Sequence, residues 1–194
     1  MMRNQTIRHL IVPGWQGSAD AHWQSHWHRS LPNSARVEQA DWLTPNREDW
    51  VAKLQRNIDS APCPTILIAH SLGCITVAHW AAQAPAELLG RVQGALLVAP
   101  ADVQRSNCPS ALQNFAPIPQ QPLPFPSQLV GSDNDSAASA ARAIELARDW
   151  GSYVTILSGA GHINVQSGHQ RWEQGFTYLY RLQNRVDQHR LRSA

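Results

Sequence analysis

The chain has 194 residues, of which 15% are charged, and its formal net charge is only +2 at pH 7. A chain of this length can bury a substantial core, so we expect one domain over residues 1–194, with about the last ten residues forming a tail. This charge balance excludes a broad basic face for nucleic acid, and no apolar run approaches the roughly 20 residues that a membrane span needs.

Short runs typical of β-strands recur along the chain, and helical patterns separate most of them. We place the strands at residues 9–13, 36–40, 65–69, 92–99, 127–131 and 153–157. Three of these runs are almost continuously apolar, which is typical of strands that are covered on both faces of a parallel sheet.

The expected helices lie between and after these strands. Two of them begin after the capping residues Asp20 and Asn46, and three begin at Leu72, at Ser136 and at Trp172, the last ending near residue 183. This order predicts a three-layer α/β domain with a mostly parallel sheet of about six strands and helices on both faces. The chain leaves little room for a separate lid domain, so none is expected.

Residues 107–126 interrupt the alternation of strands and helices. The segment contains six prolines, and a long helix cannot form at that density. We interpret it as an ordered, extended crossover that runs along the surface. A flexible loop that gates access of the substrate is the alternative, since long loops without regular structure are often functional.

Ser71 lies between the apolar run at residues 65–69 and a helical pattern. A serine hydroxyl attacks a carbonyl only when a base takes its proton, and a sharp strand-to-helix turn is the geometry that exposes it best. The residues two before and two after it, Ala69 and Gly73, are small enough for such a turn. The sequence therefore predicts a nucleophile, and the alternative is a serine that only caps the helix.

Two backbone amides near Ser71 are candidates for stabilising an oxyanion. Leu72 begins the helix, where amide N–H groups lack an internal partner. The P-G-W-Q-G loop after the first strand is expected to supply the second amide, that of Trp15, unless it is only an ordinary turn. Gly14, Trp15 and His70 are the positions expected to contact the substrate, although the side chain of His70 should point to the other side of the turn.

Candidate partners for the serine follow the last two expected strands. Asp133 and Asp135 lie in the first of these loops and His162 lies in the second. Both loops lie at the carboxyl ends of strands, where ligands bind in open α/β sheets. We expect His162 to accept the Ser71 proton while a carboxylate holds its imidazole, and the spacing leaves both aspartates open.

Several motifs taken together resemble one family. They are PGWQGS, VEQADW, AHSLGC, ALLVAP, GSDND and GAGHIN, and they extend over almost the whole chain. The chain resembles the small serine hydrolases of the α/β-hydrolase superfamily, the retinoblastoma-binding protein nine-like group with its bacterial relatives. The resemblance implies Ser71 as nucleophile, Asp135 as acid and His162 as base. The family usually has proline after this aspartate, whereas Ser136 stands here, so Asp133 remains the alternative acid.

The expected activity is hydrolysis of a small carboxylic ester, thioester or amide through an acyl-enzyme, with no cofactor and no metal. One alternative is a protein of the same fold that binds a partner and has little catalytic activity, although no sequence feature identifies such a partner. Another alternative is a metal-dependent hydrolase that uses His22, His26 and His28.

The three cysteines form neither an even disulfide framework nor a C-x-x-C pair. This pattern favours a reducing compartment, and the first apolar run is too short for the core of a signal peptide. We therefore expect a cytoplasmic protein whose partner is a small acyl substrate, with no nucleic acid and no membrane bound.

Overall fold

The computed structural model describes residues 6–193. A single sheet runs through them in the order β2-β1-β3-β4-β5-β6, and every neighbouring pair is parallel. Its strands are β1 (Arg8–Val12), β2 (Ser34–Arg36), β3 (Thr65–His70), β4 (Val92–Val98), β5 (Ser127–Ser132) and β6 (Tyr153–Leu157). The expected six-stranded parallel sheet is confirmed.

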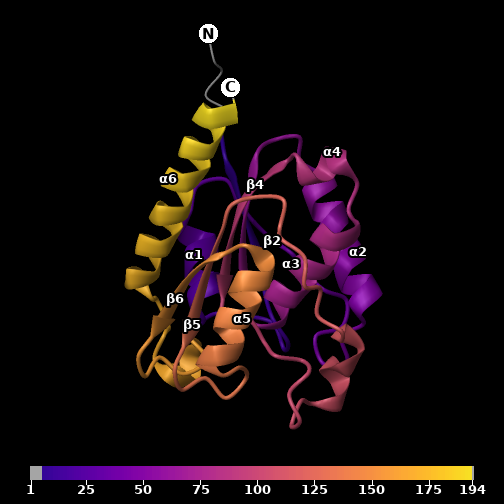
Figure 1. The fold of residues 1–194 in the computed structure, drawn as a ribbon, viewed down its shortest axis with the longest axis vertical. Coiled ribbons are helices and arrows are strands. Elements are labelled where there is room, and N and C mark those ends of the chain that lie inside the picture. The colour runs from indigo at the N-terminus through magenta and orange to yellow at the C-terminus, as the bar shows by residue number, and fades with distance from the viewer. Residues whose placement is uncertain (1–5, 194) are drawn as a thin grey trace.

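Helices cover both faces of this sheet, so the molecule has three layers. The α-helices are α1 (Trp23–Ser30), α2 (Arg47–Asp59), α3 (Leu72–Gln83), α4 (Ala86–Leu89), α5 (Ala140–Trp150) and α6 (Phe176–Ser193). Helices α1 and α6 lie on one side of the sheet, while α2, α3 and α4 lie on the other, where α5 also packs (Figure 1). No inserted lid domain occurs within residues 6–193.

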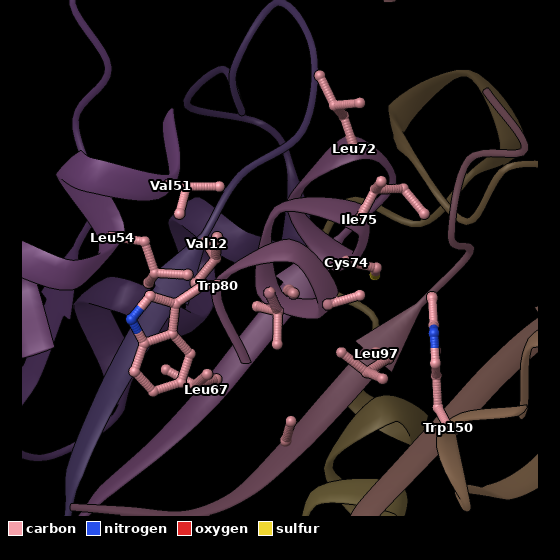
Figure 2. Close-up of a cluster of buried hydrophobic side chains, with 14 of the residues drawn as sticks. Val12, Val51, Leu54, Leu67, Leu72, Cys74, Ile75, Trp80, Leu97 and Trp150 are labelled. Carbon is pink, nitrogen blue, oxygen red and sulfur yellow. The ribbon is translucent and has the colours of Figure 1, made fainter. Parts of the chain in front are cut away.

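The central strands are apolar throughout because they bury both of their faces. Leu67 and Ala69 of β3 pack into the core beneath α2, α3 and α5, and Ile66 and Ile68 pack into the core beneath α1 and α6. Successive side chains of a strand point to opposite faces, so a strand between two helical layers needs apolar residues at every position. Figure 2 shows part of the first core, where Leu67 shares the cluster with Trp80 of α3.

The proline-rich crossover is ordered and fastened to the first core. It contains the short 3₁₀-helix η1 (Ser110–Phe115), and Phe115 is fully buried. The Nε2 of His79 donates a hydrogen bond to the Phe115 carbonyl at 2.7 Å, and the Trp150 indole donates one to the Pro119 carbonyl at 2.8 Å. The expected surface crossover is thus present, with indole and imidazole side chains holding its backbone.

Two helices begin later than the sequence predicts. The cap of α1 is His22 rather than Asp20, since the imidazole Nδ1 accepts a hydrogen bond from the Gln24 amide at 3.1 Å. The cap of α5 is Ser139 rather than Ser136, since its hydroxyl accepts from the Arg142 amide. The chain before Ser139 forms a turn that belongs to the site described below.

Two further boundaries differ from the expected ones. Strand β2 lies at Ser34–Arg36 instead of residues 36–40. Helix α6 begins at Phe176 rather than Trp172 and continues to Ser193, so the described part of the expected tail is helical. The helix extends because Val186 still packs into the core and Arg185 stacks on Tyr153 of β6, 3.6 Å from the ring centroid. No helix in residues 6–193 has the length and apolar character required to cross a membrane.

Candidate active site

Ser71 lies on a sharp turn between β3 and α3. Its backbone has φ 55° and ψ −121°, a conformation that is strained for a residue other than glycine and costs on the order of 1–3 kcal/mol. Any side chain at position 73 would clash, because a Cβ there would lie 2.3 Å from the Val12 carbonyl oxygen. Ser71 is the N-cap residue of α3, but its hydroxyl makes no capping hydrogen bond to the helix.

The Ser71 hydroxyl instead faces an imidazole. His162 Nε2 lies 2.9 Å from Ser71 Oγ, and His162 Nδ1 lies 2.9 Å and 3.0 Å from the two carboxylate oxygens of Asp135. The Asp135 side chain is only 2% exposed, and the Ala137 amide donates to its Oδ1 at 2.7 Å. These three side chains come from the ends of β3, β5 and β6, so the parallel sheet brings them to one edge.

Asp133 has a different position and different partners. Its Oδ1 accepts a hydrogen bond from the Gly159 amide at 2.7 Å, and this bond lowers the pKa of the carboxyl group, with a further contribution from Ser158. The structure therefore places Asp135, and not Asp133, against His162. The family that this sequence resembles usually has proline at the position of Ser136. The serine does not prevent the contact between Asp135 and His162.

Side chains outside the proposed triad hold the loop that carries His162. Asn134 Oδ1 accepts a hydrogen bond from the Gly161 amide at 2.7 Å, and the Trp23 indole donates to the Ile163 carbonyl at 2.9 Å. Asn164 forms a capping box with Ser167 at the start of the short helix η2 (Val165–Ser167). The available signal for Asn134 was its place in the short polar turn after β5, whereas no sequence signal puts Trp23 against this loop.

The two amides expected at an oxyanion hole lie beside Ser71. The loop after β1 packs closely against the turn at Ser71, because a Cβ added at Gly14 would lie 2.8 Å from Ser71 Cβ. The Trp15 indole fixes this loop by donating to the Leu43 carbonyl at 2.9 Å. Within residues 6–193 neither the Trp15 amide nor the Leu72 amide has a hydrogen-bond acceptor, so both are free to bind an oxyanion.

Ser71 and His162 open onto a pocket of about 470 Å³. Trp15 and His70, two of the positions expected to contact the substrate, line it, whereas Gly14, the third, packs against Ser71 and does not line it. The side chain of His70 does not point away from the site as the sequence predicted. Its Nε2 donates to the His162 carbonyl oxygen at 2.9 Å, so it both lines the pocket and fixes the loop of the base.

The three histidines of the first helical segment do not come together. His22 lies in the pocket wall with its ring centroid 4.9 Å from that of His70, whereas His26 contacts Arg29 and His28 contacts Ser34. Burial lowers the pKa of His22 to about 4, with smaller contributions from His162 and Arg36. No three or more His, Cys, Asp or Glu side chains within residues 6–193 are grouped as metal ligands would be.

Comparison with known proteins agrees with this architecture. The model of the serine hydrolase family matches residues 9–181. A YdeN-like hydrolase from Pectobacterium atrosepticum is 32% identical, with 93% of this chain and 92% of that chain covered and a TM-score of 0.81. A comparison with curated proteins gives no match.

More distant solved structures share the fold. The YdeN gene product of B. subtilis is 18% identical, with 90% of this chain and 100% of that chain covered and a TM-score of 0.70. YbtT, a type II thioesterase from the yersiniabactin pathway, is 20% identical, with coverage of 95% and 96% and a TM-score of 0.63. The family match, extending over most of the sheet and both candidate loops, establishes that this chain belongs to the serine hydrolase family and has the α/β-hydrolase fold.

Proposed function

We propose that this serine hydrolase cleaves a small carboxylic ester, thioester or amide through an acyl-enzyme on Ser71. The observation that carries the proposal is the unbroken contact from Ser71 Oγ to His162 Nε2 and from His162 Nδ1 to the Asp135 carboxylate, with both distances at 2.9 Å. A carboxylate can only accept, so Nδ1 carries the proton and Nε2 presents a lone pair to the serine hydroxyl.

In the acylation step, His162 Nε2 takes the hydroxyl proton of Ser71 as Oγ forms a bond to the substrate carbonyl carbon. The carbonyl π electrons move to oxygen, and the Leu72 and Trp15 amides stabilise this oxyanion. When the oxyanion collapses, the bond to the leaving group breaks and Nε2–H gives its proton to the departing atom. The Asp135 carboxylate stabilises the imidazolium that exists between these two transfers.

In the deacylation step, a water molecule replaces the leaving group. His162 removes a proton from the water while its oxygen attacks the acyl carbon, and the second oxyanion uses the same two amides. Collapse returns the proton to Ser71 Oγ and releases the carboxylic acid. The pocket of about 470 Å³ lies toward the lower part of the range for small-ligand sites, which supports a short acyl group.

The test is covalent labelling with a fluorophosphonate, followed by location of the modified peptide by mass spectrometry. We expect wild type to be labelled on Ser71 and Ser71→Ala to be unlabelled. Cys74→Ala is the matched control, because Cys74 lies on the same helix but is fully buried, and burial raises the pKa of its thiol. It should label like wild type. A folded wild-type protein that takes no label would favour the alternative, a binding protein that has lost turnover.

A series of para-nitrophenyl esters tests the size of the acyl group. We expect kcat/KM to be highest for short acyl chains, since no lid domain extends the pocket in residues 6–193. A steady rise of kcat/KM toward long-chain esters would contradict this expectation while leaving the role of Ser71 intact.

A further inference from the structure

Arg105 is a charged side chain in the wall of the candidate active site. It lies in the loop after β4 and lines the same pocket as Ser71 and His162. Among the described residues that line this pocket there is no Asp, Glu or Lys. Apart from the imidazoles, Arg105 is therefore the only ionisable group of the described lining, and it places one positive charge in the wall of the pocket that Ser71 also lines.

The charge of Arg105 is not matched by a neighbouring carboxylate. Its Nη1 donates to the backbone carbonyl of Asp102 at 2.7 Å, but the Asp102 carboxylate is engaged by Arg142 at 3.4 Å. Within residues 6–193 no carboxylate oxygen lies within 4.0 Å of the Arg105 guanidinium. Its Nε is enclosed by the protein without a hydrogen-bond partner, whereas its Nη2 has no acceptor among the described residues and is not enclosed, so Nη2 is the unpaired donor that a pocket ligand can reach.

The Arg105 guanidinium keeps unpaired donors although the residue is half-buried. Buried charges and buried donors in proteins are normally paired, since an unpaired one costs free energy. A guanidinium that lines a pocket and keeps donors unused can instead be paired by a ligand. Its planar fork matches the two oxygens of a carboxylate, and such charge-assisted pairs are among the strongest hydrogen bonds in proteins.

We propose that Arg105 binds a free carboxylate of the substrate, so that the enzyme selects esters or thioesters that carry a second, unesterified carboxylate over neutral ones. This inference rests on the proposed function. One arginine without a neighbouring lysine in the described pocket lining matches a single negative charge better than a phosphate dianion does. The carboxylate can belong to the acyl part or to the alcohol part of the ester, and the experiment separates the two.

Two matched substrate pairs provide the test. The para-nitrophenyl monoester of adipic acid is compared with para-nitrophenyl hexanoate for the acyl part, and para-acetoxybenzoate is compared with para-acetoxybenzamide for the alcohol part. We expect wild-type kcat/KM to favour the anionic member of one pair by roughly 10- to 100-fold, the usual range for a hydrogen-bonded charge pair. The pair that shows the preference identifies the part of the substrate that Arg105 contacts.

Variants assign the preference to the side chain. Arg105→Gln should bring the ratio within that pair close to one, and Arg105→Lys should retain part of the preference, because it keeps the charge but loses the fork. Arg185→Gln is the matched control: Arg185 binds Gln128 and stacks on Tyr153 away from this pocket, so its loss should leave the ratio unchanged. If Arg105→Gln does not fold, Arg105→Lys is used for the test instead. A kcat/KM ratio in Arg105→Lys equal to that of wild type would then overturn the proposal.

The same preparations separate this proposal from the proposed function. Protein that is labelled on Ser71 but shows a ratio near one for both pairs would overturn the assignment of Arg105 alone. Protein without labelling or turnover would overturn the proposed function, and ligand-observed NMR with adipate then decides on Arg105. Adipate binding to wild type that is lost in Arg105→Gln would support the carboxylate site, and no adipate binding to wild type would overturn it.

Discussion

Replacing Asp135 by asparagine should remove most of the activity while leaving the fold intact. Oδ1 of Asp135 accepts from the Ala137 amide at 2.7 Å, and His162 Nδ1 lies 2.9 Å from Oδ2 and 3.0 Å from Oδ1. An asparagine keeps the first bond only if its carbonyl oxygen takes the Oδ1 position, which points its NH₂ at Nδ1. That NH₂ is a donor, so it favours the tautomer with the proton on Nε2, and the imidazole can no longer accept the Ser71 proton.

The expected loss in kcat is about 10⁴-fold, the value for the same change in a serine protease triad, which corresponds to about 5 kcal/mol of transition-state stabilisation. The assay is kcat for a short-chain para-nitrophenyl ester, with thermal unfolding measured on the same preparations. Asp133→Asn is the matched control. Its carbonyl oxygen can still accept from the Gly159 amide, so kcat should stay within about threefold of wild type.

The reasoning fails if Asp135→Asn retains kcat within about tenfold of wild type, a factor worth only ~1.4 kcal/mol. It also fails if a folded Asp133→Asn loses as much activity as Asp135→Asn. The first result would mean that the contact between Asp135 and His162 does not orient the imidazole during turnover. The second would move the acid role to Asp133.

Two further outcomes follow from the backbone at Ser71 and from the buried His22. Ser71→Gly and Ser71→Ala should both be inactive. In urea unfolding, the free energy of unfolding of the glycine variant should be higher by about 1 kcal/mol, because glycine relieves the strained φ of 55°. Equal unfolding free energies would show that the turn is not strained. His22 keeps a pKa of about 4 in the folded protein against 6.5 when unfolded, so the unfolded chain binds more protons between these values and stability falls as pH decreases through this window. The loss should reach roughly 3 kcal/mol near pH 4, and His22→Asn, which can still cap α1, should show a smaller loss in urea unfolding between pH 7 and about pH 4.5.

The sheet and the turn at Ser71 were predictable because they depend on local sequence rules. A strand that buries both faces must be apolar at successive positions, and β3 is. Only glycine fits at position 73, where α3 meets the end of β1, because a Cβ there would lie 2.3 Å from the Val12 carbonyl oxygen. The order of the candidate acid and base along the chain was equally readable, since each follows a recognisable strand.

Helix starts were less predictable because capping preferences did not select among neighbouring residues. Histidine is outside the group of preferred cap residues, yet His22 caps α1, while the preferred Asp20 lies outside the helix. Ser136 and Ser139 are both serines, so capping preference alone cannot decide which of them begins α5. The contacts of the neighbouring Asp135 decide it. The Asp135 carboxylate binds the Ala137 amide, which holds the chain in a turn and delays α5 until after Ser139.

The pocket lining was the least predictable part, because topology fixes where loops meet but not which side chains point inward. Parallel strands bring the loops after β1, β3, β5 and β6 to one edge, and these short turns carry the proposed chemistry. The loop after β4 belongs to the same edge and leads into the long crossover, and it supplies Arg105. No spacing rule places that guanidinium in the pocket, since its position depends on the Asp102 carbonyl and on the pairing of Asp102 with Arg142. The residues proposed for catalysis thus lie in segments with strong local constraints, whereas the residue proposed for substrate selection lies in a longer loop that such constraints do not fix.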